Sequence, residues 1–168
     1  MNKDLVVGLG EIGTPILQVI SKAIPAAGYD IDQKLVDRRK FDSLSNHTTI
    51  FAHICIPFTE RFVDSVSQIY QQHKPKIIVI HSTISPETTQ KIQKKLDIPV
   101  IYSATRGVHK RMVKDLKRYT KFYSVYDWAP KSKWAAKQYE KRMRDSGIKT
   151  KKMSNIHQRI AYFSTFSI

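Results

Sequence analysis

The sequence is poor in cysteine and has no long apolar run. Its single cysteine, Cys55, excludes an internal disulfide framework. No apolar run reaches the length that a membrane-spanning helix needs, which argues against a membrane protein. A strand-like run begins within the first few residues, so we expect no cleavable signal peptide. These features together favour a protein of the reducing cytoplasm.

Acidic residues are also scarce. The chain has 14 Asp and Glu against 29 Lys and Arg, which gives a formal net charge of +15. Such a balance attracts phosphorylated ligands and polyanions, so a nucleic-acid-associated protein stays open as an alternative. Hydrophobic residues make up 41% of the 168 residues, which suits one globular domain, with or without a fragment of a second.

Apolar runs of strand length alternate with amphipathic segments along the chain. The run at 76–81 is almost continuously apolar, as is typical of a central parallel strand buried on both faces. Alternation of this kind predicts an α/β fold with a doubly wound, mostly parallel sheet in three layers. The expected strands are 5–7, 24–29, 49–56, 76–81, 99–103, 121–126 and 149–153. The expected helices are 14–23, 32–44, 60–72, 85–96, 132–145 and 155–168.

The expected organisation is one domain over residues 1–153 and a C-terminal helix within 154–168. The apolar side of that helix has no other predicted element to pack on. We therefore expect it to begin a linker or to mediate dimerisation, and we expect a homodimer or a separate catalytic chain as partner.

Three of the six glycines stand together in GLGEIG, at Gly8, Gly10 and Gly13. This G-x-G-x-x-G follows a predicted strand and opens a predicted helix, the context in which it indicates dinucleotide binding. In that motif Gly8 permits the tight turn, Gly10 lets the backbone approach a pyrophosphate, and Gly13 lets helix and strand pack closely. The amino end of the helix then offers N–H groups to the phosphates.

An acidic residue about twenty positions after such a turn binds the adenosine ribose hydroxyls. Asp30 stands twenty positions after Gly10, and Asp32 is the alternative. A carboxylate at this place repels a 2′-phosphate, so the sequence favours NAD over NADP. Two other interpretations stay open: Asp30 caps the next helix, or a 2′-phosphate is accommodated by the basic residues that follow, Lys34, Arg38 and Arg39.

Four segments occur together in a familiar order: GLGEIGTP, GYDID around Asp30, HICIPF from His53, and HSTISPETT from His81. Together they resemble the NAD-binding half of UDP-glucose/GDP-mannose dehydrogenases, within the wider 6-phosphogluconate dehydrogenase-like superfamily. The similarity covers about residues 4–89 well and continues more loosely to the end. It implies a Rossmann-type domain that binds NAD.

The resemblance also implies roles for single residues. Ile56 and Pro57 would lie beside the path of the adenosine ribose and the nicotinamide, and Ser82 and Thr83 close to the nicotinamide. The threonine that matches Thr83 helps to organise the active-site water and substrate in the family. The expected cofactor-binding residues are therefore Gly8, Gly10, Glu11, Ile12, Gly13, Asp30, Ile56, Pro57 and Ser82.

The sequence departs from the family in two ways. The family's second domain, which carries a catalytic lysine, asparagine and nucleophilic cysteine, has no counterpart before the chain ends at Ile168. Cys55 lies in a predicted core strand, where packing is the expected role. The glutamate that the family places in an Asn-Pro-Glu-like segment is also absent, and the basic segment 103–109 stands in that region.

Two histidines and one arginine are further candidates. His81 ends a predicted strand, where it would donate a hydrogen bond or shuttle a proton, or else bond to backbone as part of the structure. Arg106 and His109 would hold an anionic substrate group, or else lie on a solvated surface loop. No Cys/His spacing indicates a metal site. The segment 109–119 predicts a basic helix, for which a solvated face is favoured over nucleic-acid binding.

These observations predict an NAD-binding oxidoreductase-like protein that corresponds to the cofactor domain of nucleotide-sugar dehydrogenases. The enzyme would act as an NAD-dependent dehydrogenase on a sugar nucleotide or a hydroxy acid, with Thr83 and His81 as catalytic candidates. The alternative is a dinucleotide-binding module without chemistry, a sensor or scaffold. A basic nucleic-acid-associated protein is the least favoured hypothesis.

Overall fold

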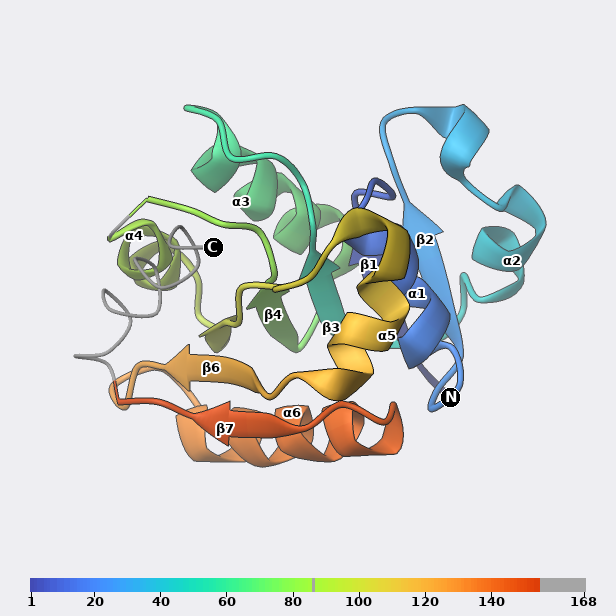
Figure 1. Ribbon diagram of the computed structural model, residues 1–168. Helices are drawn as coiled ribbons and strands as arrows, with labels where there is room; N and C mark the ends of the chain where they lie inside the picture. The colour runs from blue at the N-terminus through green and yellow to red at the C-terminus, as the bar shows by residue number, and fades with distance from the viewer. Residues whose placement is uncertain (86, 155–168) are drawn as a thin grey trace.

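The computed structural model describes residues 1–85 and 87–154. Within them one seven-stranded sheet runs through the molecule in the order β2-β1-β3-β4-β5-β6-β7 (Figure 1). All neighbouring strands are parallel except β5 and β6, which pair antiparallel. The strands are β1 Asn2–Val7, β2 Ala26–Tyr29, β3 Thr48–Ile54, β4 Ile77–Ile80, β5 Val100–Tyr102, β6 Lys121–Val125 and β7 Thr150–Lys152.

Helices cover both faces of the sheet, because successive strand residues point to opposite sides and each face is apolar. In β1, Val6 belongs to one buried cluster, whereas Leu5 and Val7 belong to the other. The first face packs against α1 Gly13–Ile20, α5 Met112–Arg118 and α6 Ser132–Asp145. The second packs against α2 Arg38–Ser43, α3 Phe62–His73 and α4 Thr88–Lys95. Two short 3₁₀ helices, η1 Gln33–Leu35 and η2 His109–Arg111, complete the described elements.

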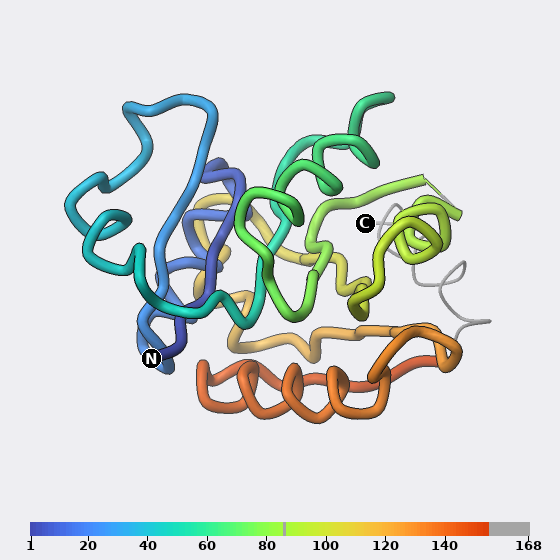
Figure 2. Tube along the Cα trace, turned by 180° about the vertical axis from the view of Figure 1, so that it is seen from behind, coloured from blue at the N-terminus to red at the C-terminus, as the bar shows by residue number. Residues whose placement is uncertain are grey.

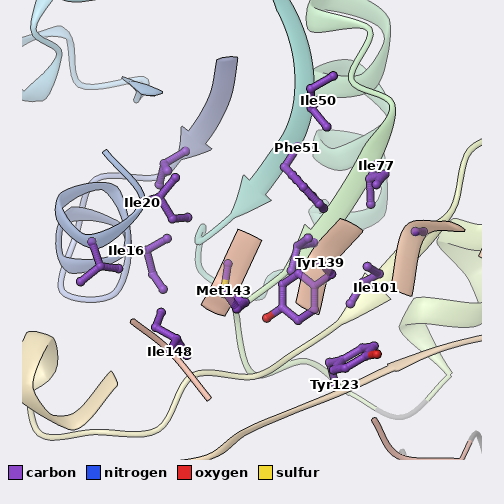
Figure 3. Close-up of a cluster of buried hydrophobic side chains, with 14 of the residues drawn as sticks. Ile16, Ile20, Ile50, Phe51, Ile77, Ile101, Tyr123, Tyr139, Met143 and Ile148 are labelled. Atoms are coloured by element: carbon purple, nitrogen blue, oxygen red, sulfur yellow. The ribbon is translucent and has the colours of Figure 1, made fainter. Parts of the chain in front are cut away.

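Aromatic rings pack together on the first face. Phe51 and Tyr139 lie in edge contact at a ring-centroid distance of 6.3 Å, and Tyr123 meets Tyr139 at 5.0 Å. Figure 3 shows these rings with Met143 of α6 and Ile101 of β5 in the same cluster. Helix α6 is thus fixed against the sheet by full burial of its inner side chains.

The strand order changes direction at β1. The chain adds β2 on one side of β1 and then returns to add β3 on the other, so the carboxyl ends of β1 and β3 lie side by side. In open α/β sheets this switch point leaves a crevice in which ligands bind. Figure 2 shows the segment 30–47 on one side of the molecule and α4 on the other, as Figure 1 does from the front.

The doubly wound α/β fold with helices on both faces confirms the fold class expected from the sequence. The expected helix start at Ser85 is wrong. Helix α4 begins at Thr88 after Glu87, whose φ of 71° makes it left-handed, and the Ser85 hydroxyl bonds to the Thr88 hydroxyl instead. The expected C-terminal helix at 155–168 lies outside the described residues. Among the described helices, none is long and apolar enough to cross a membrane.

Candidate functional site

The turn after β1 depends on two glycines for its own packing. Gly8 has a φ of +90°, and a Cβ there would lie 2.8 Å from the carbonyl carbon and oxygen of Cys55, which follows β3. A Cβ on Gly13 would come within 1.6 Å of the Gly8 carbonyl oxygen. The turn therefore closes against both its own helix and the neighbouring strand, and neither position admits a side chain.

Gly10 is different, because a Cβ there would meet no atom within 4 Å. The bare backbone at this position is exposed and unobstructed. Helix α1 begins three residues later, with no capping side-chain bond from Ile12 and no acidic side chain in its first turn. An uncapped helix start attracts anions through its free N–H groups and its positive dipole end. The residues present fit a diphosphate at this turn.

Asp30 closes the turn from β2. Its Oδ2 accepts a hydrogen bond from the Leu9 amide at 2.7 Å, and its Oδ1 accepts one from the Asp32 amide at 2.8 Å. Each carboxylate oxygen has a second lone pair, so the group can still accept from ligand hydroxyls. Asp32, the alternative ribose ligand, caps η1 instead by accepting from the Lys34 amide at 3.1 Å.

The other expected cofactor residues lie at the same edge of the sheet. The Ser82 hydroxyl donates to the Ile56 carbonyl oxygen at 2.6 Å and so ties the segment after β4 to the segment after β3. Pro57 follows Ile56 and is exposed, and Thr83 follows Ser82 and is partly exposed. The structure therefore brings the glycine turn, Asp30 and the β3 and β4 ends to one edge, as expected for parallel strands.

A buried row of polar side chains crosses the first face of the sheet beneath α6. We call Asp4, His53, His81, Ser103 and Lys121 the polar row, and each is at most 8% exposed. His53 Nδ1 lies 2.9 Å from His81 Nε2, and His53 Nε2 lies 3.3 Å from Asp4 Oδ2. Because a carboxylate oxygen accepts hydrogen bonds, His53 Nε2 is the ring nitrogen that donates the hydrogen bond to Asp4.

Two contacts bind Asp4 into this row. Its Oδ2 also accepts from Arg142 Nε of α6 at 2.7 Å, and its Oδ1 accepts from the Phe51 amide at 3.4 Å. The β1–β3 register shifts between Lys3 and Leu5, which turns the Phe51 amide toward the carboxylate. The buried carboxylate of Asp4 thus accepts hydrogen bonds from donors of β3 and α6.

His81 is fully buried, and its ring bonds to His53. Burial lowers the pKa of His81 well below its ordinary value, and the charges of Lys121 and His53 lower it further. The imidazole is therefore neutral near pH 7. A proton shuttle through His81 would have to act by way of His53 or Lys121, since the ring itself does not reach the surface.

Lys121 holds the segment that follows β5. Its ammonium donates to the Ser103 carbonyl at 2.6 Å, the Ala104 carbonyl at 3.1 Å and the Thr105 hydroxyl at 2.9 Å. Burial lowers the pKa of Lys121 to about 7. Burial likewise raises the pKa of the Cys55 thiol to about 12, against the opposing effect of the Lys121 charge. An un-ionised thiol suits packing rather than nucleophilic attack.

The loop after β5 carries the expected anion-binding residues. Asp115 is buried and accepts from the Val108 amide at 2.9 Å, which anchors this loop. His109 Nδ1 lies 3.8 Å from Glu11 Oε1 of the glycine turn, and both side chains are exposed. Arg106 is exposed and forms no ion pair with any described residue. His109 therefore lies beside the glycine turn, whereas Arg106 forms no such ion pair with the turn.

Sequence reasoning missed Asp4, His53 and Lys121 as a connected group. The available signal was a charged or ionisable residue inside an otherwise apolar strand run, at Asp4 and His53, on the same side as His81. Lys121 had no such signal, because its partners come from the segment after β5. In the part of the chain that the structure describes, no group of His, Cys, Asp and Glu could hold a metal ion.

Comparisons with solved structures give the same fold. UDP-D-ManNAc dehydrogenase from Pyrococcus horikoshii matches over 92% of this chain, with a TM-score of 0.71 and 19% identity. UDP-N-acetyl-mannosamine dehydrogenase from Staphylococcus aureus matches over 96%, with a TM-score of 0.70 and 16% identity. Prephenate dehydrogenase from A. aeolicus, in complex with hydroxyphenyl propionate and NAD+, matches over 95%, with a TM-score of 0.69 and 14% identity.

The matched regions make up 47% and 49% of the two UDP-sugar dehydrogenases and 63% of the prephenate dehydrogenase, so the chain spans about half the length of the first two. No family model matches the sequence, and no curated protein sequence matches it. The structural neighbours expected from the glycine motif and the strand-end segments are therefore found, at an identity that shows the fold.

Proposed function

We propose that this chain binds NAD at the glycine turn and is the cofactor-binding part of a dehydrogenase of the nucleotide-sugar type. The open space at Gly10, directly before an uncapped helix start, is the observation that carries the proposal. Structural neighbours that are dehydrogenases, one of them holding NAD+, support it.

The residues at this edge have distinct tasks in the proposed site. The diphosphate lies over Gly10 against the first-turn amides of α1, as Glu11 and Ile12 contribute backbone rather than side-chain groups. Asp30, held in place by the Leu9 amide, accepts from the ribose hydroxyls. Its charge disfavours a 2′-phosphate, and we therefore propose NAD over NADP.

The reaction edge lies after β3 and β4. Bound NAD supplies a hydride acceptor. Ile56 and Pro57 line the path toward that edge, and Ser82 fixes the Ile56 carbonyl so that Thr83 is presented beside it. His109, which lies 3.8 Å from Glu11 of the glycine turn, is the group proposed to face an anionic substrate, and Arg106 of the same loop is the second candidate. A second domain or a partner chain supplies the remaining catalytic groups, because the Cys55 thiol is un-ionised near pH 7.

A non-catalytic dinucleotide-binding module is the second candidate. It is favoured by the engagement of both buried bases, since His81 is paired with His53 and Lys121 bonds to three acceptors. NAD reduction in the presence of a panel of sugar nucleotides and hydroxy acids separates the two candidates. We further propose a reducing compartment such as the cytoplasm, in keeping with the single unpaired cysteine.

Isothermal titration of NADH and NADPH against the wild type and Gly10→Val tests the binding proposal. We expect the wild type to prefer NADH and the variant to lose NADH binding, because the new side chain occupies the phosphate position. The matched control is Ser45→Val, which adds the same side chain at an exposed turn far along the chain. Full NADH affinity in Gly10→Val, with an unchanged melting temperature, would overturn the proposal.

A further inference from the structure

A second hollow lies at the opposite edge of the sheet from the glycine turn. Its volume is about 580 Å³, within the range of small-molecule sites. We call it the basal pocket; it is lined by Tyr70, Gln71, Lys74, Pro75, Lys76, Asp97, Ile98, Pro99, Lys131 and Trp134. Tyr70 and Gln71 lie near the end of α3. Residues 74–76 and 97–99 lie in the turns that lead into β4 and β5, and Lys131 and Trp134 lie at the start of α6.

The basal pocket carries excess positive charge. Lys74, Lys76 and Lys131 are exposed, and none of them forms an ion pair with another described residue. Asp97 is the one carboxylate that lines the pocket, and it already accepts a hydrogen bond from the Tyr70 hydroxyl. That bond raises the pKa of Tyr70, so the phenol stays protonated and the carboxylate stays engaged. Among the described lining residues, three lysines thus stand against one carboxylate, so the pocket keeps an excess of positive charge.

The start of α6 adds to this charge. Lys131 at the N-cap position is left-handed, with a φ of 52°, and makes no capping side-chain bond. No acidic residue stands in the first turn, so the positive end of the helix dipole is uncompensated. The uncapped start of α6 thus adds a partial positive charge at Lys131, beside the charges of Lys74 and Lys76.

Apart from Gln71, the rest of the lining is apolar. Pro75, Ile98 and Pro99 form part of the wall, and Trp134 is 38% exposed although it is a large aromatic side chain. An exposed indole offers a stacking surface to a planar ring. The pocket combines a surface for an aromatic ring with groups that bind phosphate.

We propose that the basal pocket binds a nucleoside phosphate, with the base against Trp134 and the phosphate among Lys74, Lys76 and Lys131. The pocket size fits one small ligand rather than a continuous strand, which argues for a free nucleotide. The site is separate from the glycine turn, because its turns lie at the amino ends of β4 and β5 whereas the glycine turn follows the carboxyl end of β1. Both ribbon views place the start of α6 on the same side as α4 (Figures 1 and 2).

Tryptophan emission tests the proposal. The chain has two tryptophans, so Trp128→Phe leaves Trp134 as the single tryptophan, which is excited selectively at long wavelength. ADP is titrated into this variant in the Gly10→Val background, so that the glycine turn does not contribute. We expect saturable quenching at submillimolar ADP, and none with adenosine, which has no phosphate.

Charge reversal locates the site. Lys76→Glu with Lys131→Glu should weaken ADP binding by roughly tenfold or more, because both lysines face the phosphate. The matched control is Lys114→Glu with Lys137→Glu, two exposed lysines outside the pocket, which makes the same change in net charge. The control should leave ADP affinity within about twofold. Circular dichroism verifies that both variants stay folded.

Three results would overturn the proposal: no Trp134 response to millimolar ADP, an equal loss of affinity in both double variants, or a response to adenosine as strong as to ADP. A single-stranded oligonucleotide that quenches Trp134 and is not displaced by ADP would overturn the assignment to a free nucleotide. None of these readings depends on whether NADH binds, because ADP is titrated in the Gly10→Val background and NADH affinity is measured separately by calorimetry.

Discussion

The glycine turn and the polar row both depend on β1 of the same sheet, yet they use their polar groups in opposite ways. At the turn, Gly10 and the first amides of α1 face open space. In the polar row, the side chains of Asp4, His53 and Lys121 form hydrogen bonds with other groups inside the protein. The first region thus leaves backbone groups open, whereas the second bonds most of its polar atoms internally, with His81 Nδ1 as a buried atom that meets no partner among the described residues.

This contrast separates binding from stability. Changes at Gly10 and Asp30 should alter ligand affinity more than folding, whereas changes in the polar row should alter folding more than affinity. It also explains why a histidine at a strand end need not be catalytic: His81 stands at the correct edge, but its ring is turned into the core.

The largest expected effect is that of Asp4→Ala. The change removes the acceptor of both His53 and Arg142 and leaves a buried imidazole and a guanidinium without their partner. We expect the free energy of unfolding to fall by roughly 3–5 kcal/mol. Urea denaturation measures it, and Asp4→Asn, which keeps one carbonyl oxygen, should lose less. Equal losses in the two variants would mean that the negative charge, which both substitutions remove, decides the loss rather than side-chain volume or the remaining carbonyl oxygen.

Gly13→Ala should come next. Its Cβ would lie 1.6 Å from the Gly8 carbonyl oxygen, so the backbone of the turn must move. We expect a loss of roughly 3 kcal/mol in the free energy of unfolding, although alanine is ordinarily the better helix former. The comparison variant is Gly10→Ala, whose Cβ meets nothing and which should change the stability by less than about 0.5 kcal/mol. Similar denaturation midpoints for the two would refute the assignment of different roles to these glycines.

Lys121 should make folding depend on pH. Its pKa falls from 10.5 to about 7 in the folded protein, so between these values the unfolded chain binds a proton that the folded chain does not. Stability contributed by this group therefore rises from pH 7 to pH 10.5 and is constant below pH 7. Between pH 7 and pH 9 we expect a rise of roughly 2–3 kcal/mol, because each pH unit in this window contributes up to about 1.4 kcal/mol. The difference in unfolding free energy between wild type and Lys121→Met, measured across this range, isolates it; a flat difference contradicts the prediction.

The smallest expected effect concerns cofactor choice. Asp30→Ala should weaken NADH binding by about tenfold and NADPH binding less, because the carboxylate accepts from a ribose hydroxyl and repels a 2′-phosphate. Calorimetry with both dinucleotides checks the ratio. Asp32→Ala serves as the matched variant, and a larger loss of NADH affinity there would transfer the ribose role from Asp30 to Asp32.

The sheet and its helices could be predicted because each pattern is local. Helix 132–145 was expected at its observed bounds, since its buried positions repeat at helical spacing and Gly147, with a φ of +80°, ends it. The helix expected from Ser85 was misplaced because the serine hydroxyl bonds to Thr88 rather than to a backbone amide. A side-chain partner of this kind is not visible in the spacing of apolar residues.

The part of the candidate site that consists of backbone groups could be predicted from the sequence. Gly8, Gly10 and Gly13 stand next to one another in the chain, and the strand before them and the helix after them fix how they are used. The polar row could not be predicted as a connected group, because the contact between Asp4 and Arg142 joins residues that are 138 positions apart. The basal pocket likewise draws its lysines from the end cap of α3, the turn into β4 and the start cap of α6.

The sequence by itself determined the order of strands and helices, and the turn at which a bare main chain meets a helix start, because periodicity and glycine act over a few neighbouring residues. The tertiary structure alone decided which polar groups form hydrogen bonds within the protein and which stay exposed. That outcome depends on burial and on partners from distant strands. For this reason His81 became part of the interior, while Gly10 kept its access to a ligand.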